Sequence, residues 1–285
     1  MEGERIVLKI GGRSLDARAG DAAYWSALAA LFERTRSVPS HAKPQESQPL
    51  SREPGGVVLV HGGGNAVDRQ LDRLGLVSER RDGIRITPPE HVEQVVAMLA
   101  GVTNKGLAAR INIAARGLGV SAIGLCLSDG NLARCSKSTR FSFDPGCVGQ
   151  VDSGDPSSVR ALWQARILPV VSSIGYDERG QALNINADDA AAAVARIIGA
   201  HAVGFISDVA GVRGRDGQTL PRLNRPQIEA LIAEGVISGG MIPKVRAALD
   251  VAEQTGARVL ILGDTPDVLA AMARGEAPGT TIVSA

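Results

Sequence analysis

Residues 57–64 read VVLVHGGG, and residues 5–12 read RIVLKIGG. Each stretch is a short run of aliphatic residues that ends in glycines. Such a run is typical of a buried strand in a parallel sheet, and glycines directly after it let the backbone turn tightly or approach a ligand. A helix is predicted after the first stretch, over residues 65–74. Together the two stretches predict an α/β fold made of strand–glycine–helix units.

The remainder of the chain continues this alternation of strands and helices. Strands are predicted over residues 5–10, 57–60, 120–125, 167–171, 203–207, 258–262 and 281–283, and helices over 22–36, 104–116, 186–198, 226–234, 245–255 and 266–272. This order predicts a mainly parallel sheet that is covered by helices on both faces.

Four segments carry other local signals. Asp82-Gly83 predicts a hairpin within residues 78–87, and residues 129–151 are polar and hairpin-like. Thr87-Pro88-Pro89-Glu90 predicts a capping box with a proline at the first helical position. Residues 37–56 carry prolines and no periodicity, so they are predicted to form a flexible loop or linker.

Composition excludes several classes of function. Lys and Arg number 31 against 30 Asp and Glu, which argues against a nucleic-acid or membrane-surface partner bound by charge. Aromatic residues make up only 3%, too few for base-stacking platforms. No apolar stretch approaches the roughly 18 residues of a membrane span. The three cysteines form no C-x-x-C pair, so neither a zinc site nor a disulfide framework is favoured. We expect a cytoplasmic protein.

Two lysines occupy positions that oppose local rules. Lys9 lies inside a strand that should be buried, and Lys244 follows Pro243 in the first turn of a helix, where a cation opposes the helix dipole. Both costs disappear if a phosphate group lies at these positions. Glycine clusters at 11–12, 62–64 and 239–240 would let backbone N–H groups approach such an anion. For each lysine taken alone, extension of the ammonium to solvent explains the residue equally well.

Two further candidates come from the residues alone. Asp188 begins a predicted helix, where an acid favours the dipole, and it could equally orient the lysines as a buried partner. Arg85 lies on the hairpin opposite Ile84 and Ile86, and it could clamp a carboxylate with two hydrogen bonds. We interpret Arg80 and Arg81 as solvated, and Cys126 and Cys135 as packing residues.

In this order, the segments 9–12 (KIGG), 61–64 (HGGG), 83–88 (GIRITP), 184–188 (NINAD) and 241–244 (MIPK) resemble those of the amino acid kinase family. The resemblance runs from about residue 5 to residue 285. It implies one domain over residues 1–285, a three-layer α/β/α sandwich around a mainly parallel eight-stranded sheet. Residues 1–175 would bind the amino acid and residues 176–285 would bind ATP.

The resemblance also implies an activity and a set of site residues. The enzyme would transfer the γ-phosphoryl group of ATP to the side-chain carboxylate of N-acetyl-L-glutamate, as in the second step of arginine biosynthesis. Mg²⁺ would be held mainly by phosphates and water, with no protein ligands. The implied catalytic residues are Lys9, Lys244 and Asp188; the implied substrate-binding residues are Gly63, Gly64, Arg85 and Asn184; the implied nucleotide-binding residues are Gly11, Gly12, Ser207, Asp208, Val209, Gly211, Ile237 and Ser238.

Several alternatives remain open at this stage. N-acetylaminoadipate differs from N-acetylglutamate by one methylene, which is worth only about 1–3 kcal/mol of discrimination. Another acidic amino acid, or a non-catalytic sensor of nucleotides or amino acids on the same fold, is also compatible. We expect a homodimer, weakly or not inhibited by arginine. The reason is that only eight residues precede Lys9, too few for the extra N-terminal helix that joins dimers into arginine-inhibited hexamers in part of the family.

Overall fold

The computed structural model describes residues 3–35, 54–81 and 83–284. One sheet of eight strands organises the chain, in the order β12-β14-β13-β11-β1-β2-β8-β5. All neighbouring strands pair in parallel except β13 and β14, which are antiparallel. The strands are β1 (Arg5–Ile10), β2 (Gly56–His61), β5 (Ser121–Cys126), β8 (Ile167–Ser172), β11 (Ala202–Ser207), β12 (Arg222–Leu223), β13 (Arg258–Gly263) and β14 (Thr280–Ile282).

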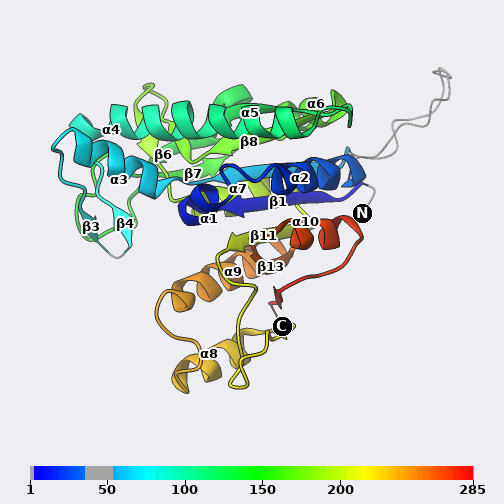
Figure 1. The fold of residues 1–285 in the computed structure, drawn as a ribbon. Helices are drawn as coiled ribbons and strands as arrows, with labels where there is room; N and C mark the ends of the chain where they lie inside the picture. Colours follow the sequence, from blue (N-terminus) through cyan, green and yellow to red (C-terminus); the bar gives the residue numbers. More distant parts are fainter. Residues whose placement is uncertain (1–2, 36–53, 82, 285) are drawn as a thin grey trace.

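Helices cover both faces of this sheet and form the outer two layers (Figure 1). On one face α2, α5 and α10 pack together, and on the other α7 packs on β1 and β11 and α9 packs on β13. The helices are α1 (Gly12–Ala17), α2 (Ala22–Thr35), α3 (Gly64–Arg73), α4 (Pro89–Val96), η1 (Ala97–Thr103), α5 (Asn104–Ala114), η2 (Asp129–Asn131), α6 (Ser157–Gln164), α7 (Ala187–Ile198), α8 (Arg225–Ala233), α9 (Met241–Thr255) and α10 (Pro266–Ala273).

Three small antiparallel pairs lie beside the main sheet. They are β3 (Arg80–Arg81) with β4 (Ile84–Arg85), β6 (Arg134–Lys137) with β7 (Gly149–Ser153), and β9 (Ile174–Tyr176) with β10 (Ala182–Asn184). The first two confirm the predicted hairpin at 78–87 and the hairpin-like segment at 129–151. The mainly parallel, helix-covered sheet confirms the predicted fold class. Of the predicted loop 37–56, residues 37–53 lie outside the described residues.

The predicted capping box at residues 87–90 is wrong in one respect. Helix α4 does begin at Pro89, but its N-cap is Pro88 and the Thr87 hydroxyl caps nothing. That hydroxyl instead donates to the carbonyl oxygen of Arg85 and accepts a hydrogen bond from Asn184. The Thr87 hydroxyl therefore bonds to Arg85 and Asn184 and not, as the local pattern predicted, to the start of helix α4.

Strand alternation sends the side chains of β1 and β2 to two different layers. Lys9 is in register with Val60, and Ile10 is in register with His61. Because successive residues of a strand point to opposite faces, Lys9 and His61 point in opposite directions. Lys9 reaches α7, and His61 reaches α5. The carboxyl ends of the strands thus carry polar side chains on both sides of the sheet.

Candidate active site

A cavity of about 230 Å³ lies at the carboxyl ends of β1 and β2. The loops after these strands face each other, since a Cβ atom on Gly12 would lie only 3.4 Å from the backbone nitrogen of Gly64. Ligands of parallel α/β sheets bind at this edge. The cavity brings together the predicted residues Lys9, Gly11, Gly12, Gly63, Gly64, Arg85, Asn184 and Asp188.

Lys9 is held at the floor of the cavity by a carboxylate. Its Nζ lies 2.8 Å from Oδ1 of Asp188, and the side chain is 16% exposed. Asp188 is positioned by the start of α7, where the Asn186 side chain accepts hydrogen bonds from the backbone N–H groups of Asp188 and Asp189. Asn186 is a helix cap that the sequence analysis did not identify, although asparagine before an acidic first turn is a recognised signal. Lys9 is largely removed from solvent, and the ion pair with Asp188 offsets the cost of burying its charge.

Lys244 lies on the same face of the sheet as Lys9, because α9 packs beside α7, but it has different partners. It lies in the first turn of α9, donates to the Ser207 hydroxyl, and its Nζ lies 3.9 Å from Oδ1 of Asp208. Asp208 also pairs with Arg13 at 2.8 Å. The structure therefore joins Asp188 to Lys9 and gives Lys244 a carboxylate of its own. Arg13 is a residue that the sequence analysis missed, because nothing in its local pattern relates it to residue 208.

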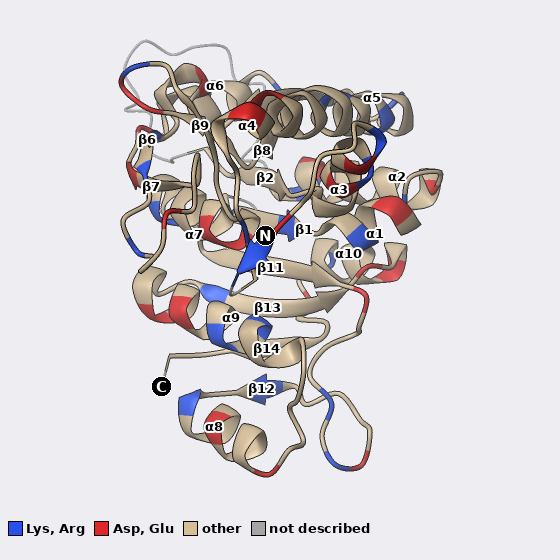
Figure 2. Cartoon of the chain, turned by 90° about the vertical axis from the view of Figure 1, so that its left-hand side faces the viewer, with Lys and Arg blue, Asp and Glu red and all other residues tan. Residues whose placement is uncertain are grey.

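The charges of this group act on one another. Burial lowers the pKa of Lys244 below its ordinary 10.5; Asp208 opposes that change, and the nearby cations Lys9 and Arg13 reinforce it. Burial would raise the pKa of Asp208, but the hydrogen bond from Ser207 and the charges of Arg13 and Lys244 outweigh it and lower the pKa. Figure 2 looks at this end of the molecule and shows basic residues of β1, α1 and α9 around it. The region is a cluster of cations that two carboxylates only partly neutralise.

Arg85 forms the opposite wall of the cavity and is 6% exposed. Its guanidinium donates to Asp68, to the Ser78 hydroxyl and, at 3.0 Å, to the carbonyl oxygen of Gly64. Burial alone would raise the pKa of Asp68, but hydrogen bonds from Arg85, Ser78 and Arg80 hold it at about 2. Arg85 is thus charged, buried and directed at the glycine turn.

Arg80 is exposed, as interpreted from the sequence, but it also has a role that this interpretation missed. Arg80 pairs with Asp68 at 2.9 Å and lines the cavity beside Arg85. The hairpin brings it there because Arg80 is in register with Arg85 across β3 and β4. Arg81 is exposed, and its guanidinium lies 4.4 Å from the ring centroid of Phe143 instead.

Asn184 and the predicted nucleotide residues complete the region. Asn184 ends β10, and its side-chain amide donates to the Thr87 hydroxyl at 3.0 Å. Ser207 and Asp208 stand at the end of β11, beside Lys244. Val209 is half-buried and Ser238 is exposed, whereas Gly211 and Ile237 are buried. A Cβ atom on Gly211 would lie 2.8 Å from Oγ1 of Thr280, so packing accounts for this glycine without a ligand.

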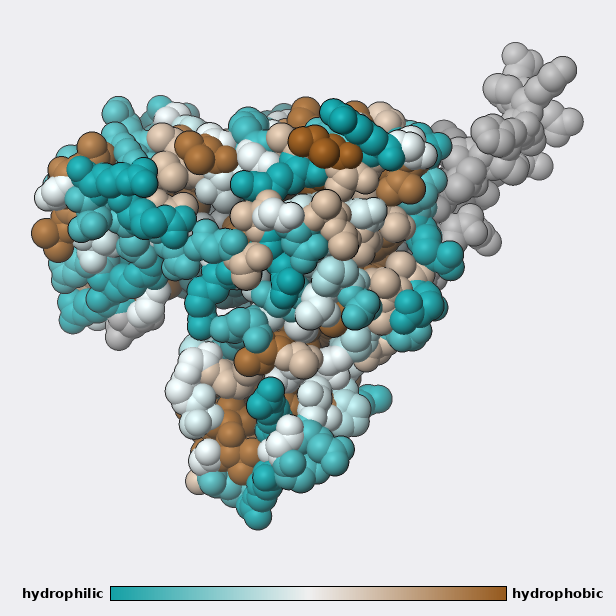
Figure 3. Space-filling view, in the orientation of Figure 1, coloured by the Kyte–Doolittle hydropathy of each residue, from teal (hydrophilic) through white to brown (hydrophobic). Residues whose placement is uncertain are grey.

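Figure 3 shows the surface hollowed between the block that carries β3 and β4 and the block that carries α9. Within the described ranges no group of three or more His, Cys, Asp and Glu side chains could hold a metal ion. Nor does any helix in those ranges combine the length and apolarity needed to cross a bilayer. The groups that the cavity and its surroundings offer to a ligand are cationic side chains, among them the buried Arg85, and the backbone amides of the glycine turns.

Comparison with known proteins defines the class. The model of the amino acid kinase family matches residues 4–263, and the chain belongs to this family. The solved structures that it resembles share the fold: smu.665 from Streptococcus mutans UA159 matches at a TM-score of 0.71 with 25% identity, over 99% of this chain and 100% of that one. Carbamate kinase of Giardia matches at a TM-score of 0.63 with 15% identity, over 100% of each chain.

Curated relatives narrow the class. Acetylglutamate kinase of Moritella profunda is 39% identical over 282 residues, which cover 98% of this chain and 96% of the relative. Acetylglutamate kinase of Pasteurella multocida strain Pm70 is 38% identical over 278 residues, which cover 97% of this chain and 98% of the relative. The chain is therefore a kinase whose curated relatives, matched over nearly their full length, are acetylglutamate kinases.

Proposed function

We propose that this kinase transfers the γ-phosphoryl group of ATP to the side-chain carboxylate of N-acetyl-L-glutamate and so produces an acyl phosphate. The observation that carries the proposal is the convergence of Lys9 and Lys244 at the carboxyl end of the sheet, each beside its own carboxylate. The names of the curated relatives supply the substrate. The product places the enzyme in arginine biosynthesis.

The chemistry demands positive charge and positioning more than proton transfer. The acceptor carboxylate is already ionised at neutral pH, because its ordinary pKa is about 4.3, and it needs no general base. It must instead approach phosphates that are also anionic. Lys9 and Lys244 offset this repulsion and stabilise the charge that spreads over the transferring group. Asp188 fixes the direction of the Lys9 ammonium.

The substrates would divide between the two sides of the site. Arg85 and Asn184 would bind the α-carboxylate end of the amino acid, with the amides of Gly63 and Gly64 beside it. Gly11, Gly12 and the Ser207–Asp208 end of β11 would face the phosphates, with residues 209, 211, 237 and 238 toward the rest of the nucleotide. The paired glycine turns fit phosphate because they leave room for backbone N–H groups to approach an anion. Mg²⁺ would neutralise phosphate charge and would be held by phosphates and water.

We further propose that the enzyme acts in the cytoplasm as a homodimer. Strand β5 is an edge of the sheet, and apolar side chains are exposed around it: Ile123 on β5, Ile113 on α5, and Leu118 between the two elements. An exposed edge strand with apolar neighbours fits a second copy of the same strand. Light scattering after gel filtration should give a dimer mass, and Ile123→Lys should shift it to the monomer; a monomer mass for the unaltered protein would contradict the proposal.

The activity is tested with a hydroxylamine trap, which captures acyl phosphates as coloured hydroxamates. We expect signal with ATP and N-acetyl-L-glutamate, and kcat/KM at least about tenfold lower for N-acetylaminoadipate, on the scale of one methylene. Unacetylated glutamate and N-acetylaspartate are the control acids. A higher kcat/KM for N-acetylaminoadipate would identify that acid as the substrate. The absence of hydroxamate with every acid would overturn the proposed function.

A further inference from the structure

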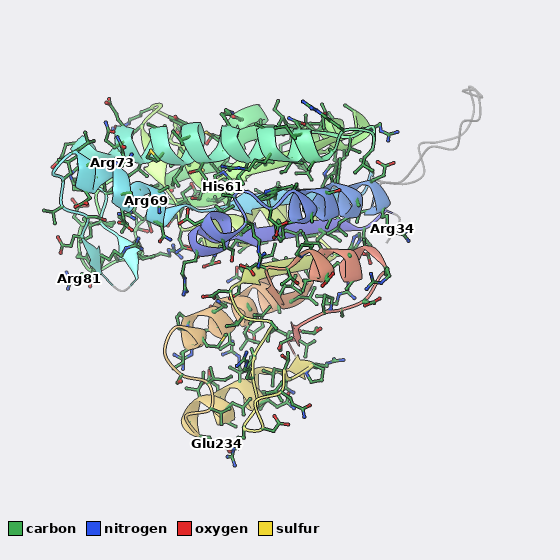
Figure 4. The ribbon with its side chains drawn as sticks, in the orientation of Figure 1. Arg34, His61, Arg69, Arg73, Arg81 and Glu234 are labelled. Atoms are coloured by element: carbon green, nitrogen blue, oxygen red, sulfur yellow. The ribbon has the colours of Figure 1, made fainter. Side chains whose placement is uncertain are left out.

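His61 is a fully buried titratable residue directly beside the cavity, and the chemistry proposed above leaves it without a role. It ends β2 and immediately precedes the three glycines that line the cavity. Figure 4 shows it between α5 and the strands, inside the molecule. It points away from Lys9, so it touches neither the phosphates nor the acceptor in any arrangement that uses Lys9.

Both ring nitrogens of His61 have partners, and these define its protonation. Nδ1 lies 2.8 Å from the carbonyl oxygen of Gly62, and Nε2 lies 3.0 Å from Nδ2 of Asn104. Since a carbonyl only accepts, Nδ1 must carry the proton. Asn104 Nδ2 also donates to the carbonyl oxygen of Val170 at 2.8 Å. Of its two further acceptors, Nε2 of His61 at 3.0 Å is nearer than the carbonyl oxygen of Leu125 at 3.4 Å, so Nε2 receives the other hydrogen.

Burial lowers the pKa of His61 to about 4, against a weaker opposing effect of the hydrogen bond to Gly62. The ring is therefore neutral at every pH at which the enzyme would work, and proton exchange with a substrate is not its task. The interaction that remains is the hydrogen bond from Nδ1 of His61 to the carbonyl oxygen of Gly62. Asn104, which begins α5, holds the ring in place from behind.

That carbonyl controls the first cavity-facing peptide of the glycine turn. The backbone N–H of Gly62 donates to the carbonyl oxygen of Ile10, which extends the β1–β2 pairing by one residue. The described chain contains no cis peptide bond, so the C=O of Gly62 and the N–H of Gly63 point in opposite directions. Holding the carbonyl against the buried ring therefore turns the N–H of Gly63 away from α5, towards the cavity.

We propose that His61, supported by Asn104, is a positioning residue that aims the backbone N–H of Gly63 at the acidic substrate. The proposal rests on the proposed function, because it needs Gly63 to meet the amino acid. Position 63 is a glycine, and a Cβ atom there would lie 2.8 Å from Cδ2 of the buried Leu99, which would then have to move. A glycine left to itself would populate several peptide orientations.

Two substitutions separate the two hydrogen bonds of the ring. In His61→Asn the side-chain amide nitrogen can replace Nδ1 and keep the bond to Gly62, while the link to Asn104 is lost. In His61→Gln the longer amide reaches towards Asn104, and the bond to Gly62 is lost. Both substitutions leave part of the same buried space empty. The fall in melting temperature of each variant therefore measures the structural cost of the substitution, apart from any effect on substrate binding.

We expect His61→Gln to raise KM for N-acetyl-L-glutamate at least tenfold while KM for ATP stays within threefold. We expect His61→Asn to keep both KM values within threefold of the unaltered enzyme. Equal changes of KM in the two variants, or an unchanged KM for the acid in His61→Gln, would overturn the proposal. If the unaltered enzyme forms no acyl phosphate, the proposed function fails instead, which is a separate result.

A measurement on the unaltered protein tests the proposal even if neither variant folds. In ¹⁵N-histidine-labelled protein, NMR distinguishes imidazole protonated at Nδ1 from imidazole protonated at Nε2. We expect the ring of His61, assigned as the signal that persists when His41, His91 and His201 are replaced in turn, to carry its proton on Nδ1 and to stay neutral down to about pH 5. A proton on Nε2 would rule out the grip on Gly62 and with it the proposal.

Discussion

The two sides of the site hold their cations in different ways. On the side proposed to bind the amino acid, Arg85 is 6% exposed and binds a carboxylate, a hydroxyl and a backbone carbonyl. On the side proposed to bind the nucleotide, Lys244 is 27% exposed, and the carboxylate near it is 43% exposed and shared with an arginine that is 75% exposed. The first arrangement is rigid before substrate arrives, whereas the second consists of contacts that water already competes for.

This difference follows from the positions of the elements. Arg85 comes from a hairpin beside α3, whose residues Gly64 and Asp68 both accept its hydrogen bonds, and Ser78 before the hairpin accepts a third. Asp208 directly follows β11 and Lys244 lies in the first turn of α9, and both side chains are partly exposed. A small acid binds more tightly to a rigid site, because less conformational entropy is lost on binding. A nucleotide brings several charges of its own and can displace weak ion pairs.

The largest expected effect comes from the lysines that join the two sides. Lys9→Met and Lys244→Met should each lower kcat by at least about a hundredfold, the scale of one lost electrostatic stabiliser. Steady-state kinetics, with circular dichroism to confirm folding, measure this. Lys137→Met is the matched control, because Lys137 is an exposed lysine paired with Asp144. A loss below tenfold for either catalytic variant would mean that the lysines do not meet at the reacting group.

The next effect tests the rigid side. Arg85→Ala should raise KM for the acid about 10- to 100-fold, since a hydrogen bond to a charged group is worth about 1.5–3 kcal/mol, and it should leave KM for ATP almost unchanged. Arg81→Ala removes the same charge from the same hairpin outside the cavity and should change neither KM. Equal increases of the two KM values in Arg85→Ala would show that the sides are not separate.

A smaller effect, on the pH profile, tests the exposed side. In the proposed reaction Lys244 acts as the cation, so kcat/KM should fall as pH rises through its lowered pKa. Asp208 raises that pKa, and Asp208→Asn should therefore move the alkaline limb to lower pH, as measured between pH 7 and pH 10.5. Glu253→Gln, which disrupts the exposed pair with Arg225, is the control. An alkaline limb that stays in place would show that Asp208 does not govern Lys244.

The smallest effect concerns acid stability on the rigid side. Asp68 has a folded pKa of about 2, below the roughly 3.9 of an unfolded chain. Its contribution is therefore present above pH 4 and is lost as pH falls through 2. Because Asp68 is 39% exposed, solvent screening limits the contribution to about 1 kcal/mol. Asp68→Asn should flatten urea-unfolding stability between pH 4 and pH 2; an unchanged slope would mean that other carboxylates carry the acid sensitivity.

Local pattern was sufficient to single out candidates where one residue broke a rule that its neighbours defined. Lys9 inside an aliphatic strand and Lys244 in a helix first turn could be marked as candidate site residues because a strand interior excludes charge and a helix N-terminus disfavours a cation. The same local logic failed at Thr87, whose hydroxyl is used by Asn184 from a distant strand. It was also incomplete at Arg80, which is exposed as expected but pairs with Asp68 and lines the cavity.

The periodicity and glycine clusters of the chain alone determined a parallel, helix-covered sheet and predicted glycine turns at one of its edges, because those features depend on residues a few positions apart. Which polar side chains meet was decided only by the fold. The pairs Lys9–Asp188, Arg13–Asp208 and His61–Asn104 join residues far apart in the chain. Their meeting depends on strand order and register, which no local sequence signal records.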